Sequence, residues 1–286
     1  MEIFGRTDLA SEARSLWLRG EGETAALPGV RAESGELHGL PLTAVEILDA
    51  RGAAALGKAP GRYYTLELPS PLSRGDGRFV DGAAAVAELL RRCLPETGER
   101  CVLIAALGNP DVTPDALGSL AAGSLLVTRH LKERGDPAFA AFSPTLLCRT
   151  GVLGTTGLES AAQVRALCDA VHPACVIAID ALAGSALEGL CRSVQICSTG
   201  IAPGSGVGND REALNERSLG VPVIAVGVPT VIDASALSPC GELGDLFVTP
   251  RFIDSAVRSV ARVLAYGINL ALHPGLSIED VDLLVG

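Results

Sequence analysis

Three nearly unbroken apolar runs of strand length most constrain the fold of this chain. They cover residues 101–107, 174–179 and 221–228. Runs of this kind are typical of strands that are buried on both faces, as the strands of a parallel sheet are. Helical patterns separate the runs, so that strands and helices alternate along the chain. We therefore predict an α/β fold with a mostly parallel central sheet covered by helices.

Further elements follow from the spacing of apolar residues and from helix-start signals. We expect helices over residues 7–18, 81–94, 159–171 and 250–272, and strands over residues 37–48, 61–68 and 192–197. Another helix is expected to run from residue 113 towards residue 131. Residues 134–157 are rich in Gly, Pro, Ser and Thr, and we expect them to form a long surface loop near the active crevice.

Acidic residues stand after the apolar runs. Asp115 belongs to Thr113-Pro114-Asp115, which has the residues of a helix start: a hydroxyl that can cap, a proline and a carboxylate. Asp180 comes directly after the second run. Open α/β sheets bind their ligands at the carboxyl ends of their strands, so we expect Asp115 and Asp180 to share one crevice and to carry the chemistry. Asp233 follows the third run in a similar setting, where a hydrogen-bonded loop residue is the favoured interpretation.

Asn109 and two glycines are further candidates for the substrate site. Asn109 could donate its amide to an oxyanion, although a turn-forming role is the favoured interpretation. Gly204 and Gly206 lie in the segment Gly204-Ser-Gly-Val-Gly208. Because a lone G-x-G-x-G is a weak signal for a phosphate loop, we expect a backbone loop that approaches the substrate or a neighbouring subunit.

Composition argues against several classes of protein. A net charge of −10 leaves no excess of Lys and Arg to neutralise phosphates, so we expect neither nucleic acid nor an anionic membrane as a partner. No apolar stretch of about 18 residues is present, which argues against a membrane span. Eight cysteines without a C-x-x-C pair are expected to be reduced thiols of a cytosolic protein.

Seven blocks spread over the chain carry a specific resemblance. They include Val112-Thr-Pro-Asp-Ala-Leu-Gly118 and Val176-Ile-Ala-Ile-Asp-Ala-Leu-Ala183, which contain the two aspartates. The other blocks cover residues 6–10, 57–67, 126–130, 199–209 and 267–274. In these blocks the chain resembles the germination protease family of endospore-forming bacteria, whose members degrade small acid-soluble spore proteins when a spore returns to growth.

The resemblance implies an endopeptidase of unusual aspartic type, made as an inactive zymogen that processes itself. The family's two essential aspartates fall on Asp115 and Asp180. A homotetramer in the cytoplasm of the spore core, acting on small acid-soluble spore proteins without a cofactor or a metal, is also implied. The fold is expected to be similar to that of the hydrogenase-maturation endopeptidases.

The amino terminus contains a substrate-like segment. Thr7-Asp-Leu-Ala-Ser-Glu12 is similar to the cleavage site in the family's substrates, where an acidic residue precedes a large apolar one. We therefore expect the chain to cut itself between Asp8 and Leu9, which makes residues 1–8 a propeptide and residues 9–286 a single α/β protease domain. In the alternative interpretation, Asp8 only caps the first helix.

Two carboxylates suit peptide hydrolysis without a covalent intermediate, because one can activate water as a base while the other protonates the leaving nitrogen. Close carboxylates share one proton and titrate as a unit. Asp115 beside a helix amino terminus is expected to favour its ionised form and to be the base. A metal-dependent endopeptidase that uses the same carboxylates as ligands, and a binding module without activity, are the alternatives.

Overall fold

The central element of the computed structural model is a mixed sheet. The structure describes residues 7–22, 27–69, 76–98, 100–205, 208, 211–234 and 246–285. Within these residues nine strands pair in the order β1-β2-β3-β7-β8-β6-β4-β5, and β9 pairs with β8. Their bounds are β1 Val30–Leu37, β2 Leu40–Ile47, β3 Gly61–Glu67, β4 Val102–Leu107, β5 Thr145–Gly151, β6 Cys175–Gly184, β7 Ser193–Cys197, β8 Val223–Asp233 and β9 Phe247–Val248.

The prediction of a mostly parallel sheet is wrong. Three pairs, β4·β5, β4·β6 and β6·β8, are parallel, whereas the other five pairs are antiparallel. Two strands of one sheet can run parallel only if a crossover of about a dozen or more residues joins them. Only residues 185–192 connect β6 to β7, and β7 accordingly runs antiparallel to β8, which is itself parallel to β6. The strands β1 and β2 form a hairpin whose turn residues His38 and Gly39 both have positive φ.

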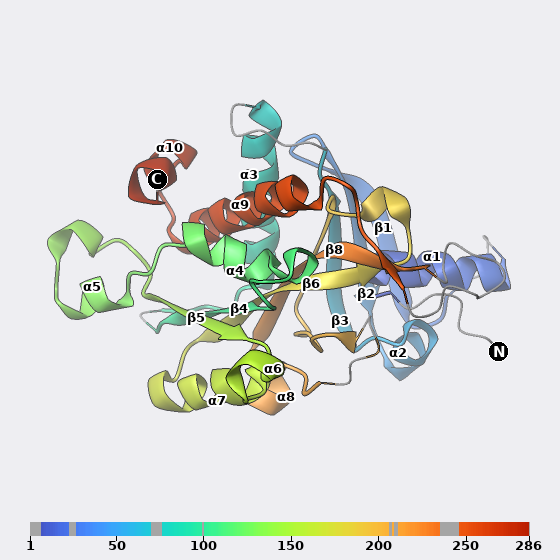
Figure 1. The fold of residues 1–286 in the computed structure, drawn as a ribbon, viewed down its shortest axis with the longest axis horizontal. Coiled ribbons are helices and arrows are strands. Elements are labelled where there is room, and N and C mark those ends of the chain that lie inside the picture. Colours follow the sequence, from blue (N-terminus) through green and yellow to red (C-terminus); the bar gives the residue numbers. More distant parts are fainter. Residues whose placement is uncertain are drawn as a thin grey trace.

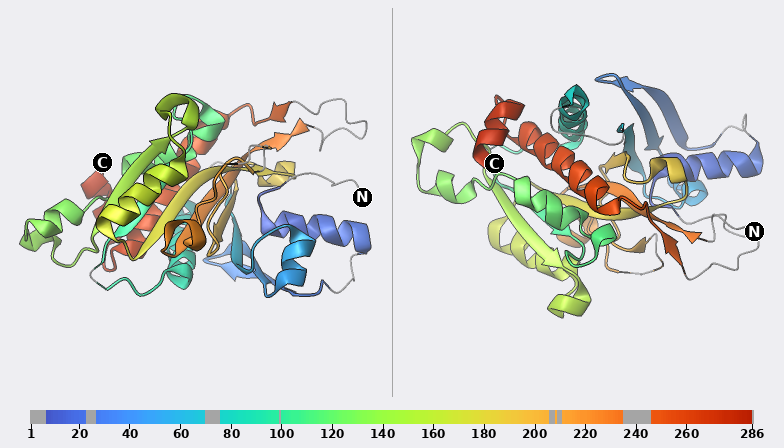
Figure 2. Two further views of the ribbon diagram at one scale, coloured as in Figure 1. Left: turned by 90° about the horizontal axis from the view of Figure 1, so that it is seen from below. Right: turned by 45° about the horizontal axis from the view of Figure 1, so that its top comes forward.

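Helices cover both faces of the sheet (Figure 1). Helices α3 Gly77–Cys93, α4 Leu117–Ala121 and α9 Ile253–Leu272 pack on one face. The opposite face carries α7 Ser160–Val171 and α8 Glu216–Leu219 at one side, and α1 Ala10–Glu21 with α2 Ala50–Leu56 at the other. Figure 2 shows α7 and α9 on opposite sides of the sheet. The short helices α5 Arg129–Glu133 and α6 Leu153–Thr156 and the last helix, α10 Ile278–Val285, complete the set.

The predicted apolar runs lie in the core. Successive side chains of a strand point to opposite faces, so β4 and β6 supply both cores at once. Ile104 and Ile177 pack with α3 and α9, whereas Leu103 and Val176 pack with α7. Because both faces of these strands are buried, their sequences are continuously apolar and do not alternate between apolar and polar residues.

Several predicted helices and loops differ from the structure. The expected helices over 159–171 and 250–272 match α7 and α9. Helix α3 begins at Gly77 rather than after Asp81, because the Asp76 carboxylate accepts the N–H of Arg78 and caps it. The expected surface loop over 134–157 contains the edge strand β5. No continuous helix follows residue 113; a 3-10 turn, η1 Thr113–Asp115, leads instead into the short α4.

Two further expectations concern cysteines and membranes. The seven cysteines in the described part of the chain are all free thiols, as predicted. Among the helices that the structure describes, none is long and apolar enough to cross a membrane.

Candidate active site

Asp180 lies inside a central strand. It was expected at the end of its strand, but β6 continues past it to Gly184, because β8 keeps pairing with β6 over that length. Its side chain is only 4% exposed. The N–H of Ala181 donates to its Oδ1 at 3.0 Å. A carboxyl group is therefore buried in the sheet, where the N–H of Ala181 donates to it.

Asp115 is held by a tight turn above the same strands. The N–H of Asn109 donates to its Oδ2 at 2.8 Å. Gly108 has a φ of +95°, and a Cβ there would stand 2.0 Å from the carbonyl oxygen of Asp115. The hydroxyl of Thr230 on β8 donates to the carbonyl oxygen of Pro114 at 2.7 Å. The turn that carries Asp115 is thus fixed both to residues 108 and 109, which follow β4, and to β8.

Thr113 does not cap a helix, whereas the Asn109 side chain has the turn-forming contact that was favoured for it. The Thr113 hydroxyl donates to Oδ1 of Asp254 on α9 at 2.8 Å, and no side-chain cap stands before η1. The Asn109 side chain accepts the N–H of Asp111 at 3.0 Å, which is a turn-forming contact. Asn109 therefore positions Asp115 through its backbone and stabilises the turn through its side chain.

The two aspartates line one cavity of about 380 Å³, which we call the aspartate cavity. Asp8, Gly204 and Arg211 line it as well. Its other lining residues are Leu107, Gly108, Val112, Pro114, Val152, Ser160, Ala181, Leu182, Ala183, Pro203, Thr230, Val231 and Phe247. Asp233, at the end of β8, is not among these described lining residues, and Gly206 lies outside the described residues.

Burial favours the protonated forms of both aspartates, and repulsion from Asp115 adds to this effect at Asp180. Burial, and then the charge of Asp115, raise the pKa of Asp180 well above its usual range. Burial also raises the pKa of Asp115, but the N–H of Asn109 and the positive charge of Arg211 oppose that rise. The pair therefore tends to hold a proton, and Asp180 is the member that keeps it.

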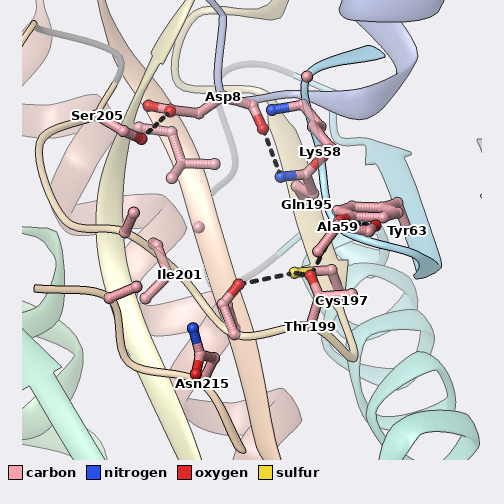
Figure 3. A pocket seen from close by; sticks show the side chains of 17 residues that line it. Asp8, Lys58, Ala59, Tyr63, Gln195, Cys197, Thr199, Ile201, Ser205 and Asn215 are labelled. Carbon is pink, nitrogen blue, oxygen red and sulfur yellow. Dashed lines mark hydrogen bonds between the residues drawn. The ribbon is translucent and has the colours of Figure 1, made fainter. Parts of the chain in front are cut away.

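Asp8 lies at a bend of the chain and contacts β6 through its backbone and its side chain. Its N–H donates to the carbonyl oxygen of Ala183 at 2.9 Å. Its carboxylate accepts from the N–H of Ala183 and from the hydroxyl of Ser205, each at 2.9 Å. Its own carbonyl oxygen accepts from Nε2 of Gln195 at 2.9 Å. Figure 3 shows Asp8 between Ser205 and Gln195.

Leu9 follows directly and is only 1% exposed. Its N–H donates to the hydroxyl of Thr7 at 3.1 Å. The α1 helix starts one residue later, with Leu9 rather than Asp8 at the N-cap position and without a side-chain cap. The alternative interpretation of Asp8 as the cap of the first helix is therefore not what the structure has.

Sequence reasoning missed Arg211, Ser205 and Gln195. Arg211 stands in loop sequence, where no local pattern separates a site residue from a surface residue. Ser205 lies in the glycine-rich segment that was expected to approach the substrate, but only the glycines were named as candidates there. Gln195 had a signal, because it is the one amide side chain in the predicted strand 192–197, whose neighbours are apolar. A polar side chain buried in such a strand requires a hydrogen-bond partner, and that partner can belong to a bound peptide.

Metal ligands would need a third donor near the pair. Within the described residues, no group of three or more His, Cys, Asp or Glu side chains is arranged to hold a metal ion. No histidine is among the described residues that line the aspartate cavity.

A buried carboxyl group and a half-buried one, which line one cavity with an acidic residue of the amino-terminal segment, define a candidate hydrolase of the acid–base type. A family model described as germination protease matches residues 7–240. A germination protease of Clostridium perfringens is 38% identical over an alignment of 324 positions, which covers 97% of this chain and 98% of that protein. One from Caldanaerobacter subterraneus is 39% identical over 333 residues, covering 98% of each. The chain therefore belongs to the germination protease family and is an endopeptidase.

Some relatives are similar to this chain over a shorter region. A germination protease of Bacillus cereus is 40% identical over 238 residues, which cover 82% of this chain and 64% of that protein. The matched family region contains Asp8, Asp115 and Asp180.

Proposed function

We propose that this endopeptidase begins the degradation of small acid-soluble spore proteins during germination, and that it cuts after an acidic residue with water activated by Asp115 and Asp180. The observation that carries the proposal is that Asp8, Asp115 and Asp180 line one cavity. Asp8 is the acidic residue of the segment that resembles the substrate cleavage site. The chain thus presents a substrate-like sequence to its own candidate catalytic pair.

The unequal environments of the pair support a division of roles. Asp115, supported by an N–H and by the nearby arginine, is the ionised base and takes a proton from water as the water oxygen attacks the peptide carbonyl carbon. Asp180, the more buried member, gives its proton to the peptide nitrogen as the carbon–nitrogen bond breaks. The pair ends with the same number of protons, with the proton now on Asp115.

The contacts of the Asp8 side chain support a preference for an acidic residue before the cut bond. Its carboxylate accepts two hydrogen bonds, from Ser205 and from the Ala183 N–H. Hydrogen bonds to an ionised acceptor are stronger than those between neutral groups. Lys58, whose Nζ donates to the carbonyl oxygen of Thr7 at 3.2 Å, adds positive charge beside it. Burial lowers the pKa of Lys58, and the charge of Asp8 opposes that change.

The occupied site supports a self-processing zymogen. Because Asp8 contacts β6 through its backbone and its side chain, the amino-terminal segment fills the place that a substrate needs. We propose that residues 1–8 are the propeptide and residues 9–286 the protease domain. Assembly as a homotetramer and location in the spore-core cytoplasm are proposed from the family alone, and light scattering of the purified chain tests the first.

Cleavage of a peptide that contains Thr-Asp-Leu-Ala-Ser-Glu by the activated enzyme tests the proposal, with and without a strong chelator. We expect cleavage after Asp at the same rate in both. Loss of cleavage in chelator with recovery in a divalent ion would support the alternative in which the carboxylates are metal ligands. No cleavage after Asp under any condition would contradict the proposed specificity.

A further inference from the structure

Gln195 is a buried amide with both of its polar ends on the amino-terminal segment. It lies in the middle of β7, every residue of which is buried, and it is 6% exposed. Its Nε2 donates to the carbonyl oxygen of Asp8 at 2.9 Å (Figure 3). Its Oε1 accepts the N–H of Ala10 at 2.7 Å. A buried amide without such partners would destabilise the fold, so this side chain depends on the segment it holds.

These two contacts span the bond between Asp8 and Leu9. One is made to the carbonyl of the residue before the bond, and the other to the N–H two residues after that carbonyl. We propose that Gln195 is the residue that holds a peptide substrate across the bond to be cut, with Nε2 at the oxygen that becomes negatively charged. This inference rests on the proposed function, in which the bond after Asp8 is cut at the aspartate pair.

The register of the sheet places Gln195 opposite Asp180. Asp180 on β6 pairs with Gly227 on β8, and Gly227 pairs with Gln195 on β7. Residues paired directly across neighbouring strands have their side chains on the same face. Two strand spacings separate the two backbones, about 10 Å, which leaves room for a peptide and a water molecule between the side chains.

The floor between these side chains is apolar. A Cβ at Gly227 would stand 2.6 Å from Cγ of Leu182, so the leucine side chain covers the glycine. Leu182 and Asp8 line the aspartate cavity and also a second cavity of about 280 Å³, which Gln195 lines as well. The two cavities therefore adjoin at Leu182 and Asp8, with Asp180 lining one of them and Gln195 the other.

The two contacts have different chemical consequences. When water adds to the carbonyl carbon, the carbonyl oxygen gains negative charge, and a donor already in place stabilises that charge without reorganisation. Loss of one such donor typically lowers kcat by about 100-fold to 1,000-fold. The acceptor contact to the Ala10 N–H is the same before and during reaction. Its loss therefore raises KM for a peptide substrate more than it lowers kcat, and in the full chain it lowers the fraction of molecules whose amino-terminal segment is docked, which slows self-cleavage. Glutamine has no charge to titrate, so neither effect varies with pH.

The test measures the first-order rate of self-cleavage of the full chain by mass spectrometry. Gln195→Met has a similar volume but no donor and only a weak acceptor, and we expect it to cleave at least about 100-fold more slowly. Gln195→Glu keeps an acceptor for the Ala10 N–H and loses the donor. Ser193→Ala, on the same strand and face, is the matched control, since its hydroxyl donates to Glu67 instead; its rate should stay within about threefold of the unsubstituted chain.

Ala10→Pro isolates the second contact because it removes the N–H. Ala10 is the first residue of α1, where proline is well tolerated, and Leu9 before it is already extended. We expect Ala10→Pro to slow cleavage in the unsubstituted and Gln195→Glu chains and to add nothing in the Gln195→Met chain. Equal slowing by Ala10→Pro in all three chains, or a folded Gln195→Met chain that cleaves within threefold of the unsubstituted chain, would overturn the inference.

A peptide experiment keeps the inference testable if Gln195→Met does not fold. The activated enzyme is given Thr-Asp-Leu-Ala-Ser-Glu with either an amide or an ester at the Leu–Ala link, the ester lacking the N–H that Oε1 accepts. We expect KM to rise about tenfold for the ester, as loss of one buried hydrogen bond implies; an unchanged KM would contradict the Ala10 contact. If the unsubstituted chain does not cut after Asp8, or if Asp115→Asn cuts at the normal rate, the proposed function fails instead.

Discussion

Replacing Asp180 with asparagine should stabilise the folded chain at high pH while it stops cleavage. Burial and the charge of Asp115 raise the pKa of Asp180, so the folded chain binds more protons there than the unfolded chain does. The stability that this group contributes is therefore present at low pH and declines as pH rises above the unfolded pKa of about 4. Asparagine has no charge to bury, and its Oδ1 can still accept the Ala181 N–H.

The size of the effect follows from the burial of this carboxyl. Asp180 is 4% exposed and accepts a hydrogen bond from the N–H of Ala181. A buried polar group with too few hydrogen bonds lowers the free energy of unfolding by about 1–3 kcal/mol. We expect Asp180→Asn to be more stable by that amount at pH 8, and by less than about 0.5 kcal/mol at pH 4, where the native carboxyl is protonated. The gain at pH 8 corresponds to a rise in Tm of about 2–4 °C per kcal/mol.

Urea unfolding at pH 4, 6 and 8, followed by the fluorescence of the single tryptophan, measures the difference. Asp111→Asn is the matched control, since Asp111 is an exposed aspartate in the turn that carries Asp115. Its free energy of unfolding should follow that of the unsubstituted chain at every pH. A less stable Asp180→Asn chain at pH 8, or an equal gain at pH 4 and pH 8, would refute the reasoning.

Two further substitutions test the specificity contact and the packing of the turn. Ser205→Ala removes one of two hydrogen bonds to the Asp8 carboxylate, so the ratio of kcat/KM for peptides with Asp rather than Asn before the cut bond should fall about tenfold; an unchanged ratio would contradict the contact. Gly118→Ala places a Cβ 2.4 Å from the carbonyl oxygen of Leu107 and 2.8 Å from that of Ile179, and should lower the free energy of unfolding by about 3 kcal/mol. Gly123→Ala, which meets nothing within 4 Å, should be nearly neutral, and equal effects of the two alanines would show that close packing at Gly118 is unimportant.

The buried strands could be located from the sequence, but their directions could not. The runs at 101–107, 174–179 and 221–228 all correspond to strands, because two-sided burial leaves a continuous apolar pattern. Direction depends on how the chain returns to the sheet. The link between β6 and β7 holds a 3-10 turn, η4 Leu187–Gly189, and no crossover helix, which the strand patterns themselves do not reveal.

Helix starts were ambiguous for a local reason. The prediction started this helix at residue 81, although Asp76 also precedes apolar positions and is a residue type that caps helices. The structure uses Asp76, and Asp81 becomes part of the helix.

The sequence could predict that Asp115 and Asp180 share one crevice, and both line the aspartate cavity, whereas most of their surroundings could not be predicted. Each of the two follows or extends a recognisable apolar run, and each lies in a block that resembles the family. Arg211 lines the aspartate cavity, and Ser205 donates a hydrogen bond to Asp8, which lines it too. Both residues come from loops that are distant in sequence from the aspartates. Their positions depend on tertiary pairing, which no local pattern contains. The raised pKa of Asp115 likewise comes from burial, a property that its place beside a helix start did not indicate.

The most direct test of the account is the rate at which the activated enzyme cuts a peptide containing Thr-Asp-Leu-Ala-Ser-Glu when either aspartate is replaced by asparagine. Asp115→Asn and Asp180→Asn should each lower kcat by at least about 1,000-fold in a folded chain, because each removes one half of a unit that acts together. The Asp111→Asn chain serves as the control and should cut at the normal rate. A folded Asp115→Asn or Asp180→Asn chain that keeps more than about a tenth of the normal kcat would contradict the central claim.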